Sequence, residues 1–305
     1  MAAKRKVLVW VRPDGRAERY EGEHRSLQLE YKETRMKYEG FRACGYNIGM
    51  GYTGLVPHYC NDENPCCDLV LLYAKMGIHC YNLLHGKELQ LIRVKKYNKS
   101  VGGGCVISSY YMTCESKDPA ATRGSVRTFQ AVVCEDSYNR FYLTCSVARL
   151  VGNGNGEKHK KTVRGYGALT SLMPKLPAED PFKEDDTITS RFYVFKESEL
   201  QEKDWIRLYL ELAVATSNRQ SAKIHSLTNL KILKAAMEIT GDPNGAIIYI
   251  RYEDSCEARV GKDVDRIALV RRIFDKDNES LILVGCNQSF IASAPLEAGS
   301  SSSQD

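Results

Sequence analysis

The sequence predicts an α+β fold in which one helix packs on an antiparallel meander, followed by a second strand-rich antiparallel domain. Three observations carry this prediction. An apolar stretch with helical spacing runs from Asp68 to Gly86. Four strand-like segments with turn-rich connectors follow it, and a further strand-rich region spans residues 187–292. A helix followed by a run of neighbouring strands is typical of this fold class.

The first 40 residues are expected to form a charged N-terminal arm. The stretch SLQLEYKETRMKYEG, from Ser26 to Gly40, places Glu and Lys at helical spacings, which predicts a short surface helix. The next domain is expected to span residues 41–151. Its main helix begins at Asp68, a good N-cap residue, and ends at Gly86. Within it, Gly77 is expected to allow a close approach to a sheet.

The meander of this domain is predicted from four segments: LQLIRV, VISSYYMTCES, SVRTFQAVVCE and RFYLTCSVARL. Their β-branched and aromatic residues are typical of strands. The connectors KDPAATRG and DSYN are rich in turn-forming residues.

Three consecutive glycines, Gly102 to Gly104, stand between the first two of these strands. A phosphate-binding loop would require a lysine and a hydroxyl residue directly after the last glycine, and then a helix. The residues that follow are CVISSYYMTC, which have strand composition and contain no lysine. The triplet is therefore expected to form a tight turn of a hairpin, where glycine tolerates positive φ.

Residues 152–186 are rich in Gly, Asn, Pro and charge, and are expected to form a linker. In the second domain, DWIRLYLELAVAT alternates apolar and polar residues from Ile206 to Val214, which predicts a strand. Two hairpins are expected after it. One turns at GDPNG and leads into AIIYIRY, and the other joins RIALVRRIFD to LILVGC. The tail, residues 293–305, is expected to be disordered.

Composition narrows the class of protein. The chain has 305 residues, 43% hydrophobic residues and a formal net charge of +5, which fits a globular protein and gives no clear nucleic-acid signature. No apolar run is long enough for a membrane span, and no secretory signal is present. The protein is expected to be intracellular, in the nucleus or the cytoplasm, with its 11 cysteines reduced.

One cluster could in principle bind zinc. It lies in HYCNDENPCCD, where His58, Cys60, Cys66 and Cys67 are potential ligands. Their spacing differs from that of structural zinc sites, so free thiols are expected and no metal or other cofactor is predicted.

Part of the first domain resembles the phytocystatins, plant inhibitors of cysteine proteases. AKMGIHCYN is similar to the family's helix motif, LQLIRVKKYN to its first long strand, and SVGGG falls at its inhibitory hairpin. The resemblance implies a cystatin-like domain in which Ser100, Val101, Gly102, Gly103 and Gly104 form a partner-contact hairpin. The family's Gln and central Val are Ser100 and Gly102 here, and its Pro-Trp pair is replaced by CEDSYN, so strong protease inhibition is not expected.

A longer resemblance covers roughly residues 30–290. LYAKMGIHCYNLLHGKELQLIRVKKYN, DWIRLYLELAVAT and IALVRRIFD are similar to the male-sterility-five-like family of plants. The resemblance implies a plant protein connected with male fertility and meiosis, and it brings no catalytic residues. A non-enzymatic protein that binds an unknown protein partner is therefore expected. The alternatives are a cystatin-type inhibitor and an enzyme without a recognisable motif.

Overall fold

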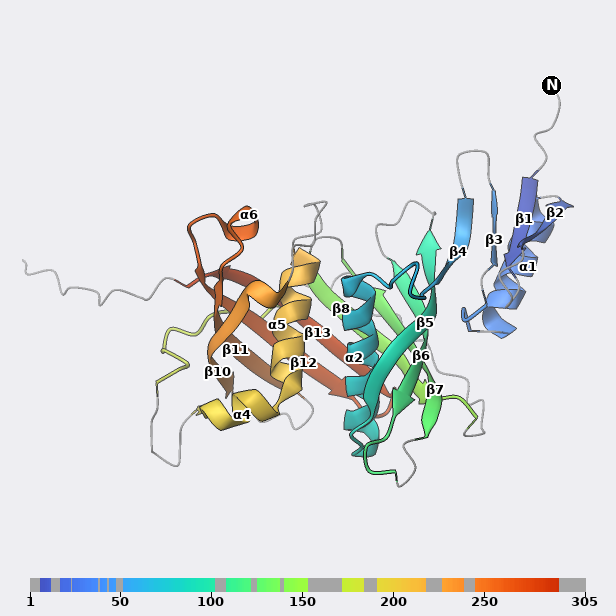
Figure 1. Cartoon of the computed structure of the whole chain (residues 1–305). Helices are drawn as coiled ribbons and strands as arrows, with labels where there is room; N and C mark the ends of the chain where they lie inside the picture. The colour runs from blue at the N-terminus through green and yellow to red at the C-terminus, as the bar shows by residue number, and fades with distance from the viewer. Residues whose placement is uncertain are drawn as a thin grey trace, which may run out of the picture.

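The strands of the protein form one large antiparallel sheet. The computed structural model describes residues 6–11, 17–22, 24–37, 39–42, 44–47, 52–101, 108–121, 125–137, 140–152, 172–183, 191–217, 227–238 and 245–290. Within these ranges the sheet has 13 strands, in the order β2-β1-β3-β4-β5-β6-β7-β8-β13-β12-β11-β10-β9 (Figure 1). The predicted combination of helices with antiparallel sheet is therefore present. The expected disordered tail lies outside the described residues.

The N-terminal region contains more than the expected arm with a helix. Helix α1 (His24–Lys37) occupies the place predicted for it, but strands β1 (Lys6–Val11) and β2 (Ala17–Gly22) precede it. Strand β1 pairs with β2 on one side and with β3 (Cys44–Asn47) on the other. The charged sequence of β2, AERYEG, shows no clear alternation, and the short apolar run of β1, KVLVWV, does not by itself distinguish a strand from a helix.

The chain then builds a unit of one strand, one helix and a four-stranded meander. The helix and meander match the prediction, and β4 leads into α2. The bounds are β4 Tyr52–Tyr59, α2 Asp68–His85, β5 Gln90–Val101, β6 Ser109–Lys117, β7 Val126–Glu135 and β8 Phe141–Leu150.

The two ends of α2 were predicted with unequal success. The helix ends at Gly86, whose φ of 58° is left-handed, as expected. At the other end the cap is Cys67 and not Asp68, which instead lies in the first turn, where its charge favours the helix dipole. The predicted close approach at Gly77 is confirmed, because a Cβ there would lie 2.5 Å from the Cβ of Ala131 on β7.

The second half of the chain repeats the same order of elements. A strand and two helices precede another four-stranded meander, whose two hairpins match the prediction. The bounds are β9 Phe192–Val194, α4 Glu197–Glu202, α5 Asp204–Ser217, η2 Leu227–Asn229, β10 Leu230–Glu238, β11 Gly245–Asp254, α6 Glu257–Val260, β12 Asp265–Asp275 and β13 Ser280–Ser289. We call the two units, β4–β8 with α2 and β9–β13 with α5, the first and second repeat.

The predicted strand from Ile206 to Val214 is wrong, because this segment is helix α5. Most of its side chains are buried, including Leu208, Tyr209 and Leu210 in succession. A helix buried nearly all round lacks the amphipathic stripe that reveals helical periodicity. Chance alternation of apolar residues therefore looked like a strand. The ion pair between Arg207 and Glu211, four residues apart, is a helical signal in the same segment.

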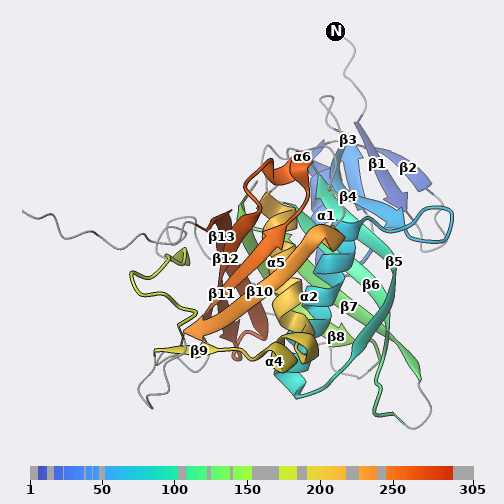
Figure 2. The ribbon, with the colours of Figure 1, turned by 60° about the vertical axis from the view of Figure 1, so that its left-hand side comes forward.

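The two repeats share one sheet and one core, which corrects the expected division into separate domains at 41–151 and 187–292. The last strands of the repeats, β8 and β13, pair antiparallel from Phe141 to Cys145. Helices α2 and α5 contact each other and lie side by side on the same face of the sheet (Figures 1 and 2). One hydrophobic cluster joins side chains of both helices with both meanders. We call this junction, β8 with β13 and α2 with α5, the seam.

The opposite face of the sheet is covered by other segments. Part of the expected linker, residues 172–183, is described, and its Phe182 is buried against Phe192, Tyr249 and Leu269. This part of residues 152–186 therefore packs on the sheet and is not a free linker. The remaining parts, 153–171 and 184–190, lie outside the described residues.

The segment after α1 covers the other half of that face. Phe41 packs against Tyr111 and Val132, and the amide of Asn98 donates to the carbonyl of Gly40 over 2.8 Å. Gly40 has a φ of 81°, and a Cβ there would overlap the ring of Tyr111. None of the helices in the described ranges has the length and apolarity needed to cross a bilayer.

Candidate functional site

The predicted partner-contact hairpin joins β5 to β6. Strand β5 ends with Ser100 and Val101, and β6 begins at Ser109, whose backbone N–H donates to the Ser100 hydroxyl over 2.8 Å. The connection between the strands runs over residues 102–108, and the tight turn expected within it stays a prediction. Gly102, Gly103 and Gly104 themselves lie outside the described residues.

A buried polar pair lies beneath this connection. The Tyr73 hydroxyl of α2 donates to the Glu135 carboxylate over 2.6 Å, and Glu135 is 3% exposed. The backbone N–H of Glu135 donates to the carbonyl of Ser108, the last residue of the connection. Glu135 thus links Ser108, the residue before β6, to helix α2, while its carboxylate stays buried.

The cysteine cluster considered for zinc gathers at the N-terminus of α2. The side chains of Cys60 and Cys66 are hydrogen-bonded to each other. The side chain of Cys67 is hydrogen-bonded to Tyr97, whose ring stacks on that of His58. Burial raises the pKa of the Cys60 and Cys66 thiols and raises that of Cys114 to about 12. In the described parts of the chain, no group of three His, Cys, Asp or Glu side chains is arranged to hold a metal ion.

Another polar cluster lies at the seam, and the sequence did not predict it. The Nε2 atom of His79 on α2 lies 2.9 Å from the hydroxyl oxygen of Tyr209 on α5. The Trp205 ring contacts the rings of both residues, and the Arg272 guanidinium of β12 lies 5.8 Å from its centroid. We call these four residues, His79, Trp205, Tyr209 and Arg272, the seam cluster.

Burial governs the protonation of the seam cluster. It lowers the pKa of His79 to about 4, with the charge of Arg272 adding to the effect, so the imidazole is neutral at pH 7. Burial also raises the pKa of Tyr209, whose hydroxyl hydrogen-bonds Arg272. Arg272 is therefore the charged member of the cluster.

The segment that supplies Trp205 and Tyr209 was predicted as a strand, which would have placed the two rings on one strand face and not on a helix beside α2.

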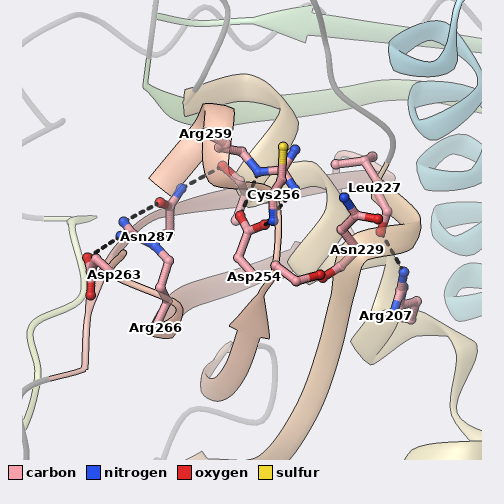
Figure 3. A network of polar contacts seen from close by, with 11 residues as sticks. Arg207, Leu227, Asn229, Asp254, Cys256, Arg259, Asp263, Arg266 and Asn287 are labelled. Carbon is pink, nitrogen blue, oxygen red and sulfur yellow. Dashed lines mark hydrogen bonds and ion pairs between the residues drawn. The ribbon is translucent and has the colours of Figure 1, made fainter. Parts of the chain in front are cut away.

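A third polar network holds the far end of the second repeat together (Figure 3). Asp254 and Arg259 form a two-pronged ion pair, at 2.6 and 2.8 Å, with both side chains almost fully buried. The Cys256 N–H also donates to Asp254, which fixes the start of α6. Nearby, Arg207 donates to the carbonyls of Leu227 and Leu230. These contacts are structural, because each carboxylate and guanidinium is engaged within the protein.

Known proteins resemble the chain over most of its length. A family model described as Protein MS5 matches residues 173–283. The UPF0725 protein EMB2204 of Arabidopsis thaliana is 37% identical over 230 residues, which cover 72% of this chain and 67% of that protein. The UPF0725 protein At3g25080 of the same plant is 46% identical over 180 residues, covering 56% of this chain and 96% of that protein.

A solved structure agrees with these matches. The crystal structure of MS5 from Brassica napus superposes with a TM-score of 0.55 at 29% identity, and the alignment covers 74% of this chain and all of that one. The longer of the two resemblances seen in the sequence is thereby confirmed. The chain belongs to the MS5-like UPF0725 family of plant proteins.

Proposed function

We propose that this protein is a non-enzymatic interaction protein that binds a protein partner inside the plant cell, in the nucleus or the cytoplasm. The male-sterility-five-like resemblance supports a role connected with male fertility and meiosis. The proposal concerns binding because the family resemblance supplies no catalytic residue and the side chains of catalytic type serve the fold.

The observation that carries this proposal is the state of those side chains. An acid–base or nucleophilic group works best when its pKa lies near the working pH. Here burial moves the values away from neutrality, to about 4 for His79 and to about 12 for Cys114, and it raises the pKa of Cys286 as well. An imidazole of such low basicity and thiols that stay protonated are poorly matched to proton transfer and to attack at pH 7, which supports the binding function.

The proposed contact element is the β5–β6 hairpin, Ser100 to Gly104. The described residues before it are anchored in the sheet, because β5 pairs with β4 as far as Val101 and with β6 as far as Lys99. On the other side, Glu135 binds the carbonyl of Ser108, which precedes β6, and is itself hydrogen-bonded to Tyr73. A hairpin on such a base is positioned for recognition, since binding residues are often found on loops held by a rigid scaffold.

Affinity capture from flower buds tests this function. We expect the full chain to retain a specific protein, and the Gly103→Glu hairpin variant to lose it. A Lys87→Gln variant is the matched control, because Lys87 is exposed after α2 and this change lowers the net charge by one, as Gly103→Glu does. The captured protein should then bind the purified chain with a defined stoichiometry in calorimetry. If all three proteins capture the partner equally, the hairpin is not the contact element. If the chain stays monomeric in bud extract, with no protein bound to it, the proposed function is contradicted.

The cystatin-type alternative has one structural observation in its favour. A helix followed by a four-stranded antiparallel meander, as the resemblance implies, is present in the first repeat. Ser100 and Gly102 nevertheless replace the residues that the inhibitory hairpin would need. The binding function is therefore preferred.

A further inference from the structure

The seam cluster contains a cation, Arg272, that pairs with no carboxylate in the described part of the chain. Among the described residues, no carboxylate lies within ion-pair distance of Arg272. Its neighbours are the neutral His79, the hydroxyl of Tyr209 and the face of Trp205. Partly buried charges are normally paired, and the cation–π contact offsets only part of the cost of desolvation.

Several other arginines of the second repeat have a carboxylate partner. Arg259 pairs with Asp254, Arg251 with Asp265, and Arg266 with Asp263. Among the described residues Arg272 has no such partner, and neither has Arg271; of these two, Arg272 is the one that stands beside Trp205 in the seam cluster. An external anion would restore the pairing that these neighbours have.

The chemistry of the cluster suits an anionic group with an apolar body. Tyr209 is fully buried and His79 is largely buried, while the side chains of Trp205 and Arg272 are partly exposed. A guanidinium presents parallel N–H donors that match the two oxygens of a carboxylate. The Trp205 ring offers an apolar surface beside them, on which the rest of a ligand can pack.

We propose that the seam cluster binds a carboxylate group, with Arg272 as its ion-pair partner and Trp205 beside its apolar portion. The ligand lies between the two repeats, because His79 comes from the first and the other three residues from the second. A free carboxylic acid and the C-terminus of a protein present the same chemistry. This site is separate from the β5–β6 hairpin, and it does not depend on the function proposed above.

Fluorescence of Trp205 reports directly on the site. The chain contains two tryptophans, so a Trp10→Phe background leaves Trp205 as the single reporter. In this background the full chain is titrated with phenylacetate and with acetate at constant ionic strength. Phenylacetamide serves as the uncharged control. Short peptides with a free and with an amidated C-terminus form a second pair of probes, which distinguishes a small acid from a protein terminus.

We expect phenylacetate to change the emission of Trp205 saturably, and phenylacetamide to leave it unchanged. Arg272→Gln should weaken this binding by about tenfold or more, as expected for a hydrogen-bonded charge pair. Arg271→Gln is the matched control, since it is the adjacent residue of β12 on the opposite face of the sheet, and it should change the affinity less than about twofold.

Arg272→Lys keeps the charge and the fold but removes the planar fork, so it should bind with intermediate affinity. Thermal unfolding of each variant shows that it is folded under the conditions of the titration. Equal binding of phenylacetate and phenylacetamide, or equal affinity of the Arg271→Gln and Arg272→Gln variants, would overturn the proposal. So would the absence of saturable binding by every carboxylate probe. A preference for the peptide with a free C-terminus would identify a protein as the source of the carboxylate.

Discussion

The contact between α2 and the sheet can be tested at Gly77. A Cβ added at this position would lie 2.5 Å from the Cβ of Ala131 on β7. Carbon atoms in contact prefer a separation of about 3.5–4.0 Å. The Cβ of Ala131 cannot rotate away, so the helix or the strand must move by about 1 Å or more, given that preferred separation.

Two opposing effects determine the stability of Gly77→Ala. On an exposed helix, Ala is more favourable than Gly by about 1 kcal/mol. Overpacking a dense core costs about 1–3 kcal/mol, and occasionally more. We expect the second effect to prevail, so that Gly77→Ala lowers the free energy of unfolding by up to about 2 kcal/mol, the difference between these ranges.

A double-mutant cycle isolates the contact. Ala131→Gly removes the facing Cβ, so Gly77→Ala should be less harmful, or even stabilising, in that background. The coupling energy between the two sites is expected to be about 1–3 kcal/mol, typical of residues in contact. Lys75→Ala, at an exposed position of the same helix, serves as the control and should change stability by less than about 0.5 kcal/mol.

Urea-induced unfolding of the four proteins and the control gives these free energies. The reasoning is refuted if Gly77→Ala stabilises the protein by about 1 kcal/mol, the value for an exposed helical position. A coupling energy near zero would also refute it. Either result would show that α2 does not pack on β7 through Gly77.

Three further predictions concern the seam, the buried ion pair and protease inhibition. Because the folded protein holds the pKa of His79 at about 4, below the usual 6.5, the stabilisation from the neutral ring is complete above pH 6.5 and is lost as the pH falls towards 4. Denaturant-induced unfolding at pH 7 and at pH 4.5 measures this loss. Between these two pH values, the free energy of unfolding should fall by on the order of 2 kcal/mol more in the wild type than in His79→Gln. Arg259→Met should cost about 3–5 kcal/mol in chemical denaturation, because it leaves Asp254 buried without its partner, and a cost below about 1 kcal/mol would contradict this. The purified chain should not inhibit papain strongly, and nanomolar inhibition in a papain activity assay would revive the cystatin-type alternative.

The sequence predicted best those elements whose signals are local. Helix α2 was found because it ends at a left-handed glycine and has a long apolar face. The hairpins of both meanders were found because their strands alternate and their turns carry Gly, Pro, Asn and Asp. These patterns depend on neighbouring residues, so a single sequence is enough to reveal them.

The missed features depend on contacts between distant residues. Helix α5 was missed because burial on nearly all sides removes the periodic stripe. The pairing of β8 with β13 joins Leu143 to Leu283, residues that no local pattern connects, and the two repeats therefore looked like separate domains. The seam cluster was missed for both reasons, since His79 and Tyr209 are brought together by the helix and by the joining of the repeats.

The claim on which the account rests is that the two repeats form one body joined at the seam. Hydrogen exchange followed by mass spectrometry at increasing denaturant tests it directly, with peptides that cover β8 and β13 separately. Strands in one cooperative unit exchange through a common opening. We expect peptides from β8 and from β13 to be among the slowest in the chain and to lose protection together, with the same dependence on denaturant. Exchange of β13 through an opening that leaves β8 protected would contradict the joined sheet.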